Sequence, residues 1–141
     1  MEPYTNPSSA YKETRVRTAG QGQLIVMLYD EAIKQIDTAV QALDTHTKKL
    51  DTVHNAITKT QNIITELTVS LDFDKGGEMA KNLFNLYMFF NQQLTEANVR
   101  KEAAPLRVVR NFMAQIRDSW VQIANIQVQP TPPSSGVNIA G

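Results

Sequence analysis

The chain has 141 residues, a length that suits one domain with a modest hydrophobic core. It carries 14 Lys and Arg against 14 Asp and Glu, so no net charge would draw it to nucleic acid or to an anionic membrane surface. The absence of cysteine excludes disulfides, thiolate metal sites and thiol nucleophiles. Because we find neither a signal-peptide core nor an apolar run of about 20 residues, we expect a cytoplasmic protein without membrane insertion.

The first nineteen residues have the composition of an extended segment. Prolines break any helix there, and most of the remaining residues are polar or charged. Tyr11 and Val16 are apolar and could pin residues 1–19 onto the domain. The alternative that the sequence leaves open is a disordered leader in which Tyr11 makes no contact.

Two amphipathic helices are predicted next, over residues 21–44 and 50–71. Because Gly20 offers no capping side chain and Gly22 weakens the first turn, we expect the start of the first helix to fray. Its apolar face, at about 100° per residue, consists of Ile25, Leu28, Tyr29, Ala32, Ile36, Ala39 and Leu43. The second helix has a heptad seam typical of bundle packing, made of Leu50, Val53, Ile57, Thr60, Ile64, Leu67 and Leu71.

A short turn with Gly76 and Gly77 leads into a third predicted helix, over residues 77–99. Paired glycines allow a sharp reversal of the chain, and Glu78 would place negative charge in the first helical turn. The predicted buried face of this helix consists of Met79, Leu83, Leu86, Tyr87, Phe90 and Leu94.

The fourth predicted helix covers residues 103–126, with Pro105 tolerated in its first turn. Its apolar residues are Leu106, Val109, Phe112, Met113, Ile116, Trp120 and Ile123. The prolines that follow exclude a helix in residues 127–141, which we expect to form a disordered tail. The fold class is therefore all-α, an antiparallel four-helix bundle over residues 20–126 with an extended N-terminal segment and a Pro-rich C-terminal tail.

No pattern of catalytic or metal-binding residues emerges. The nearest approach to the Glu-x-x-His motif of di-iron bundles ends at His54, and His46 lies in a connection rather than in a second motif. The glycines around Lys75 lack the spacing of a phosphate-binding loop, and no histidine is placed beside a serine to activate it. We therefore expect no metal and no cofactor, and we keep an enzyme only as a formal alternative.

Several apolar residues are surplus to the predicted core. Phe84 and Met88 lie roughly 110° or more from the centre of the buried face of their helix, and Phe89 lies beyond its other edge. They could simply flank the core. They could also form a groove for an amphipathic partner helix, because monomers rarely leave large apolar patches exposed. The candidate partner-binding residues on the helices are Ile63, Phe84, Met88, Phe89, Val108 and Phe112.

Several motifs together resemble the bacterial flagellin export chaperone family, over about residues 10 to 126. They are Ala10-Tyr11, Leu28-Tyr29-Asp30-Glu31-Ala32, Ile63-Ile64-Thr65-Glu66-Leu67, Lys75-Gly76-Gly77-Glu78-Met79-Ala80-Lys81-Asn82-Leu83, Leu86-Tyr87, Ala97-Asn98 and Trp120. The resemblance implies a non-enzymatic cytoplasmic bundle that holds the C-terminal segment of flagellin in apolar grooves. It also implies delivery of flagellin to the flagellar type III export gate. The N-terminal segment with Tyr11 and Val16 would cover the groove without client and contribute to recognition by the gate.

The sequence also departs from the family pattern at informative positions. Gly20-Gln21 replaces the usual Ser-Pro before the first helix, which would loosen the hinge of the N-terminal segment. Phe84 and Met88 stand where the family usually has polar residues, so they would extend the client groove or make a dimer contact. The alternative function is a non-enzymatic helical bundle that acts as a structural or adaptor protein and self-associates weakly, with Phe84 and Met88 at a two-fold interface.

Overall fold

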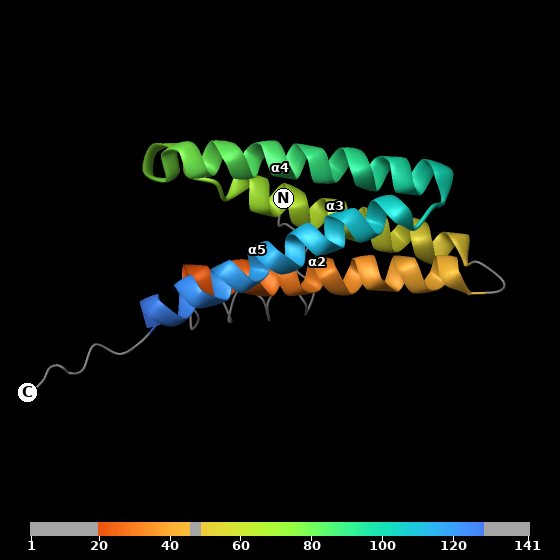
Figure 1. Cartoon of the computed structure of the whole chain (residues 1–141), viewed down its shortest axis with the longest axis horizontal. Helices are drawn as coiled ribbons and strands as arrows, with labels where there is room; N and C mark the ends of the chain where they lie inside the picture. The colour runs from red at the N-terminus through yellow and green to blue at the C-terminus, as the bar shows by residue number, and fades with distance from the viewer. Residues whose placement is uncertain (1–19, 46–48, 129–141) are drawn as a thin grey trace, which may run out of the picture. The chain divides into compact units, whose positions relative to one another are not determined.

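The structure, a computed structural model, describes residues 20–45 and 49–128. These residues form α2 (Gln21–Asp44), α3 (Leu50–Val69), α4 (Phe73–Arg100) and α5 (Ala104–Val128), and they include no strand (Figure 1). The predicted all-α class is confirmed. The predicted extended segment with Tyr11 and Val16 lies outside the described residues, as does the chain beyond residue 128.

The chain divides into two compact units. Met27–Arg117 form one unit, which contains most of α2 and α5 and the whole of α3 and α4. The described part of the other unit consists of residues 20–26 and 118–128. The packing discussed below lies within Met27–Arg117.

Charged side chains show that α2 and α5 run antiparallel along one another. Three arginines of α5 pair in reverse order with three aspartates of α2 that are spaced seven residues apart. The pairs are Arg117–Asp30 at 2.7 Å, Arg110–Asp37 at 3.0 Å and Arg107–Asp44 at 3.1 Å. Because seven residues are close to two helical turns, the three aspartates share one face of α2.

Neutral polar side chains join α3 to α4. Gln61 donates from Nε2 to Thr95 Oγ1 at 3.0 Å, and Asn98 Nδ2 lies 3.0 Å from His54 Nδ1. Since the residue further along α3 pairs with the earlier one on α4, the two helices are antiparallel, and they lie side by side in Figure 1. These contacts and the ion pairs confirm the predicted antiparallel bundle.

The core contains one hydrogen bond between aromatic hydroxyls. Tyr29 of α2 and Tyr87 of α4 are both buried, and their oxygens lie 2.8 Å apart. Burial raises the pKa of the Tyr87 hydroxyl above its ordinary value of 10.0, while its hydrogen bond with Tyr29 acts in the opposite direction. The other large, fully buried side chains of the core include Ile36, Ile57, Ile64, Leu67, Phe90, Leu94, Leu106 and Met113.

The connection between α3 and α4 differs from the prediction. Helix α3 ends at Val69, and α4 begins at Phe73, where the Asp72 side chain accepts hydrogen bonds from the backbone N–H groups of Asp74 and Lys75. Gly77, with φ of 52° and ψ of −124°, then kinks the chain inside α4. A side chain at this φ would be strained.

Two predictions about buried faces are wrong at helix ends. Met79 is 60% exposed and Leu50 is 45% exposed, although both lie on the apolar faces read from the sequence. Periodicity identifies the face on which a residue lies, but it does not show how far neighbouring helices extend along that face. Leu50 is the first residue of α3, and Met79 directly follows the kink of α4 at Gly77.

Candidate apolar binding surfaces

Three phenylalanine rings from α4 and α5 pack together at the surface. Phe112 of α5 lies edge-on to Phe89 at 6.1 Å between centroids, and 6.1 Å from Phe90. Phe90 is fully buried and forms the floor of this cluster, whereas Phe89 is 36% exposed and Phe112 is 42% exposed. Val108, one helical turn before Phe112, is also exposed. We call Phe89, Val108 and Phe112 the aromatic patch.

A second apolar surface lies on another side of α4. Phe73 and Phe84 make an edge-on ring contact at 6.1 Å, and Met88 follows Phe84 by one turn. In a continuous helix Phe73 and Phe84 would be about 16 Å apart along the axis. The kink at Gly77 therefore folds the first turn of α4 back toward Phe84. We call the three exposed residues Phe73, Phe84 and Met88 the α4 ridge.

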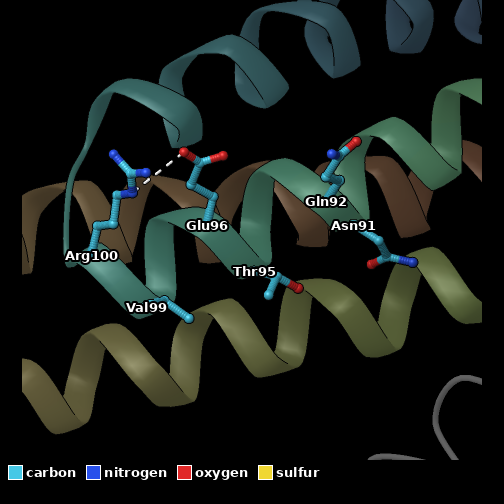
Figure 2. Close-up of a pocket in the computed structure, with 6 residues that line it drawn as sticks. All are labelled: Asn91, Gln92, Thr95, Glu96, Val99 and Arg100. Carbon is cyan, nitrogen blue, oxygen red and sulfur yellow. Dashed lines mark ion pairs between the residues drawn. The ribbon is translucent and has the colours of Figure 1, made fainter.

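Beyond the α4 ridge, the same helix carries an open surface depression of about 520 Å³. It is lined by Asn91, Gln92, Thr95, Glu96, Val99 and Arg100. Figure 2 shows that Asn91, Thr95 and Val99 lie on the side of α4 toward α3, whereas Gln92, Glu96 and Arg100 point away from α3. The Oδ1 atom of Asn91 is buried and has no hydrogen-bond partner among the described residues.

The structure separates the partner-binding residues predicted from the sequence into groups. Phe89, Val108 and Phe112 come together, whereas Phe84 and Met88 belong to the ridge. Ile63 is only 6% exposed, so a partner could reach it only if the surrounding side chains moved. Tyr11 and Val16 lie outside the described residues, and their roles stay predictions.

The sequence interpretation missed Phe73, because it predicts a turn before residue 77 and begins the third helix only there. Its signal was Asp72, an N-cap residue type placed directly before Phe73. The signal for the pairing of α2 with α5 was the regular spacing of acidic residues along α2. Both signals are local and visible in the sequence.

Neither a metal centre nor a membrane span emerges from the part of the chain that the structure describes. No three His, Cys, Asp or Glu side chains of residues 20–45 and 49–128 lie close enough together to hold a metal ion. His54 is engaged with Asn98. None of the described helices is both long and apolar enough to cross a membrane.

Comparison with known proteins relates this helical chain to one family. The family described as Flagellar protein FliS matches residues 4–127. The flagellar secretion chaperone FliS of Bacillus subtilis (strain 168) is 29% identical over 132 residues, which cover 94% of this chain and 96% of that protein. The protein of the same name from Escherichia coli (strain K12) is 31% identical over 110 residues, 77% of this chain and 79% of the relative. For the Salmonella typhimurium protein of that name, 38% identity extends over 58 residues, 41% of this chain and 43% of that one. The chain therefore belongs to the Flagellar protein FliS family.

Proposed function

We propose that this chain is a cytoplasmic flagellar export chaperone that binds the C-terminal segment of newly made flagellin. By covering that segment it prevents premature polymerisation, and it then delivers flagellin to the flagellar type III export apparatus. Membership of the family supports the chaperone role, and relatives over nearly the whole chain carry the name flagellar secretion chaperone. The proposal involves no catalysis, cofactor or nucleic acid.

The single observation that carries the binding mode is the exposed aromatic patch. Phe89 and Phe112 come from different helices. Phe89 is 36% exposed and Phe112 is 42% exposed, although both pack against the buried ring of Phe90. An apolar residue of a client helix could pack beside these rings without any rearrangement of the core. Val108 extends the patch along α5 by one turn, which matches the spacing of contacts made by a docked helix.

The energy available from the patch is sufficient for chaperone binding. Burying one large apolar side chain contributes roughly 1.5–3 kcal/mol before the client's ordering costs are subtracted. Three such side chains, with matching residues on the client, are compatible with a dissociation constant on the order of micromolar. Such binding could hold the client and still release it at the export apparatus.

The N-terminal segment would regulate access to the patch. We expect Tyr11 and Val16 to cover apolar surface when flagellin is absent and to become available to the export gate when flagellin displaces them. Tyr11→Asp should then strengthen binding of a flagellin peptide and weaken binding of the gate component. If peptide affinity falls instead, the segment binds the client and does not cover the patch.

The direct test is titration calorimetry with a peptide of the C-terminal, helix-forming segment of flagellin. We expect one-to-one binding with a gain in helicity, and at least tenfold weaker binding in Phe89→Asp and in Phe112→Asp. The matched control is Val69→Asp, which places the same charge on a residue that is 79% exposed at the end of α3. Circular dichroism of each variant checks that the bundle remains folded.

Two results would overturn parts of the proposal. A folded chain that binds no flagellin peptide at high micromolar concentration would remove flagellin as the client. Equal affinities of wild type, Phe89→Asp and Phe112→Asp would keep the client but place it away from the aromatic patch.

A further inference from the structure

We propose that the surface around the aromatic patch selects client helices by the side chains that flank their apolar stripe, and that it favours Asn, Gln, Ser and Thr over charged residues. This inference rests on the proposed function, because it specifies the chemistry of the client that this same surface would hold. It is supported by the uncharged sides of α4 and α5 next to the patch, and by the pairing of the arginines of α5 with α2.

The side of α4 that carries Phe89 is lined by carboxamides. Residues three, four or seven positions from Phe89 share its side of the helix. Within residues 82–95, a stretch without Asp, Glu, Lys or Arg, these are Asn82, Asn85, Leu86, Gln92 and Gln93. All four carboxamides are exposed except that of Gln93, which is partly buried. Charge returns on this side of α4 only beyond the stretch, at Glu78 and at Glu96.

The side of α5 that carries Phe112 is uncharged as well. Within Met27–Arg117, the residues three, four or seven positions from Phe112 are Pro105, Val108, Val109, Gln115 and Ile116. The three arginines of α5 lie about 140° to 160° around the helix from Phe112. There they pair with aspartates of α2. Their positive charges are therefore held away from the aromatic patch.

The two uncharged sides meet at the patch. Phe89 and Phe112 lie edge-on to one another, with 6.1 Å between their centroids. The surface thus has apolar rings at its centre and carboxamides around them. Residues 82–95 extend over about 20 Å of α4, which is enough to contact about 13 residues of a client helix.

Carboxamides suit neutral polar side chains of either hydrogen-bonding sense. Each has an NH₂ group that donates and a carbonyl oxygen that accepts. A client Asn, Gln, Ser or Thr beside the patch can therefore donate to a carboxamide or accept from it.

Charged side chains of a client would be disfavoured at the same positions. A Lys, Arg, Asp or Glu there would lose part of its hydration beside apolar rings and would find no opposite charge. The surface therefore discriminates against charged flanks because it offers them no partner. Since binding would involve no ion pair, we expect its affinity to be insensitive to salt.

Titration calorimetry with three versions of the flagellin peptide tests this inference. In these versions the positions that flank the apolar stripe are all Gln, all Glu or all Lys. The wild type should bind the Gln version at least fivefold more tightly than either charged version. Added sodium chloride should leave the affinity for the Gln version unchanged.

A charge placed beside the patch should create a preference between the two charged versions. Gln93→Lys should bind the Glu version at least fivefold more tightly than the wild type does, and it should bind the Lys version more weakly. The gain should shrink with added salt. The matched control is Asn62→Lys, the same exchange of a carboxamide for a lysine on an exposed residue of α3, which should change none of the affinities. Because each peptide is compared across variants, its own helicity does not affect the result.

Two results would overturn the inference and leave the proposed function intact. One is a wild type that binds all three versions equally or prefers a charged one. The other is a folded Gln93→Lys chain with the same affinities as Asn62→Lys, which would mean that the carboxamides do not face the client. A wild type that binds neither these versions nor the unmodified flagellin peptide would instead overturn the proposed function, and this inference with it.

Discussion

The inner and outer faces of α4 use similar side chains for different purposes. On the inner face Tyr87, Phe90 and Leu94 are at most 1% exposed, whereas Phe84 and Phe89 on the outer sides are 37% and 36% exposed. Phe89 and Phe90 are neighbours in sequence and differ by about 100° around the helix axis. The contrast shows that direction around the helix, rather than residue type, decides whether an aromatic side chain belongs to the core or to a surface.

The largest effect on the free energy of unfolding should come from replacing Phe90, the buried member of this pair. Phe90→Ala should cost about 3–5 kcal/mol of unfolding free energy, because it leaves a cavity among buried side chains. Phe89→Ala removes a partly exposed ring and should cost less than about 2 kcal/mol. Urea unfolding of both variants measures the difference. Equal losses would mean that the two rings are equally part of the core.

A smaller, pH-dependent effect should come from the hydroxyl pair on the inner face. Burial raises the pKa of Tyr87 in the folded state above 10.0, so the unfolded chain loses this proton at lower pH than the folded chain. The contribution of Tyr87 to stability is therefore fully present below about pH 10 and is lost as pH rises through its raised pKa. Unfolding measured between pH 8 and pH 11 should show this fall, and Tyr87→Phe should reduce its slope. An unchanged slope in Tyr87→Phe would assign the fall to other groups.

The smallest effect should come from the solvent-exposed seam between α2 and α5. Both partners of the Arg107–Asp44 pair are more than half exposed, so Arg107→Ala should change stability by only about 0.2–1 kcal/mol. The difference should shrink further at high salt because the charges are screened. Thermal unfolding at low and high salt measures this effect. A loss above about 2 kcal/mol would show that this seam contributes as strongly as the core.

Much of the fold follows from local patterns. The predicted bounds of α2 agree with the structure at both ends, because its apolar period is regular and flanked by polar residues. The predicted start of α4 is wrong, because the paired glycines suggest a turn. In the structure Asp72 caps a helical turn that precedes the kink at Gly77. The prediction that Met79 is buried is wrong for a related reason. Met79 lies directly after that kink, at the start of the regular part of α4, and is exposed.

The candidate surfaces were predictable only in part. The angular position of Phe84, Met88 and Phe89 indicated surplus apolar surface, and the structure leaves all three partly exposed. The division into an aromatic patch and an α4 ridge was not predictable, because it depends on where Phe112 packs across the α4–α5 contact. The pairing of Tyr29 with Tyr87 likewise depends on which helices are neighbours, and periodicity does not encode that.

The ion pairs between α2 and α5 fix the direction of α5 along α2, but they do not by themselves fix its register. Asp30, Asp37 and Asp44 repeat every seven residues, and so do Arg110 and Arg117. If α5 slid by seven residues, about 10.5 Å, Arg117 would meet Asp37, Arg110 would meet Asp44, and two of the three ion pairs would survive.

The aromatic contacts allow only one of these two alignments of α5. The same slide would put Ser119 in the place of Phe112 and remove both ring contacts with Phe89 and Phe90. The charges therefore specify only that α5 runs antiparallel along α2, in either of two alignments. Phe112 selects one of them, so a residue of the proposed client surface also fixes the alignment of the helix that carries it.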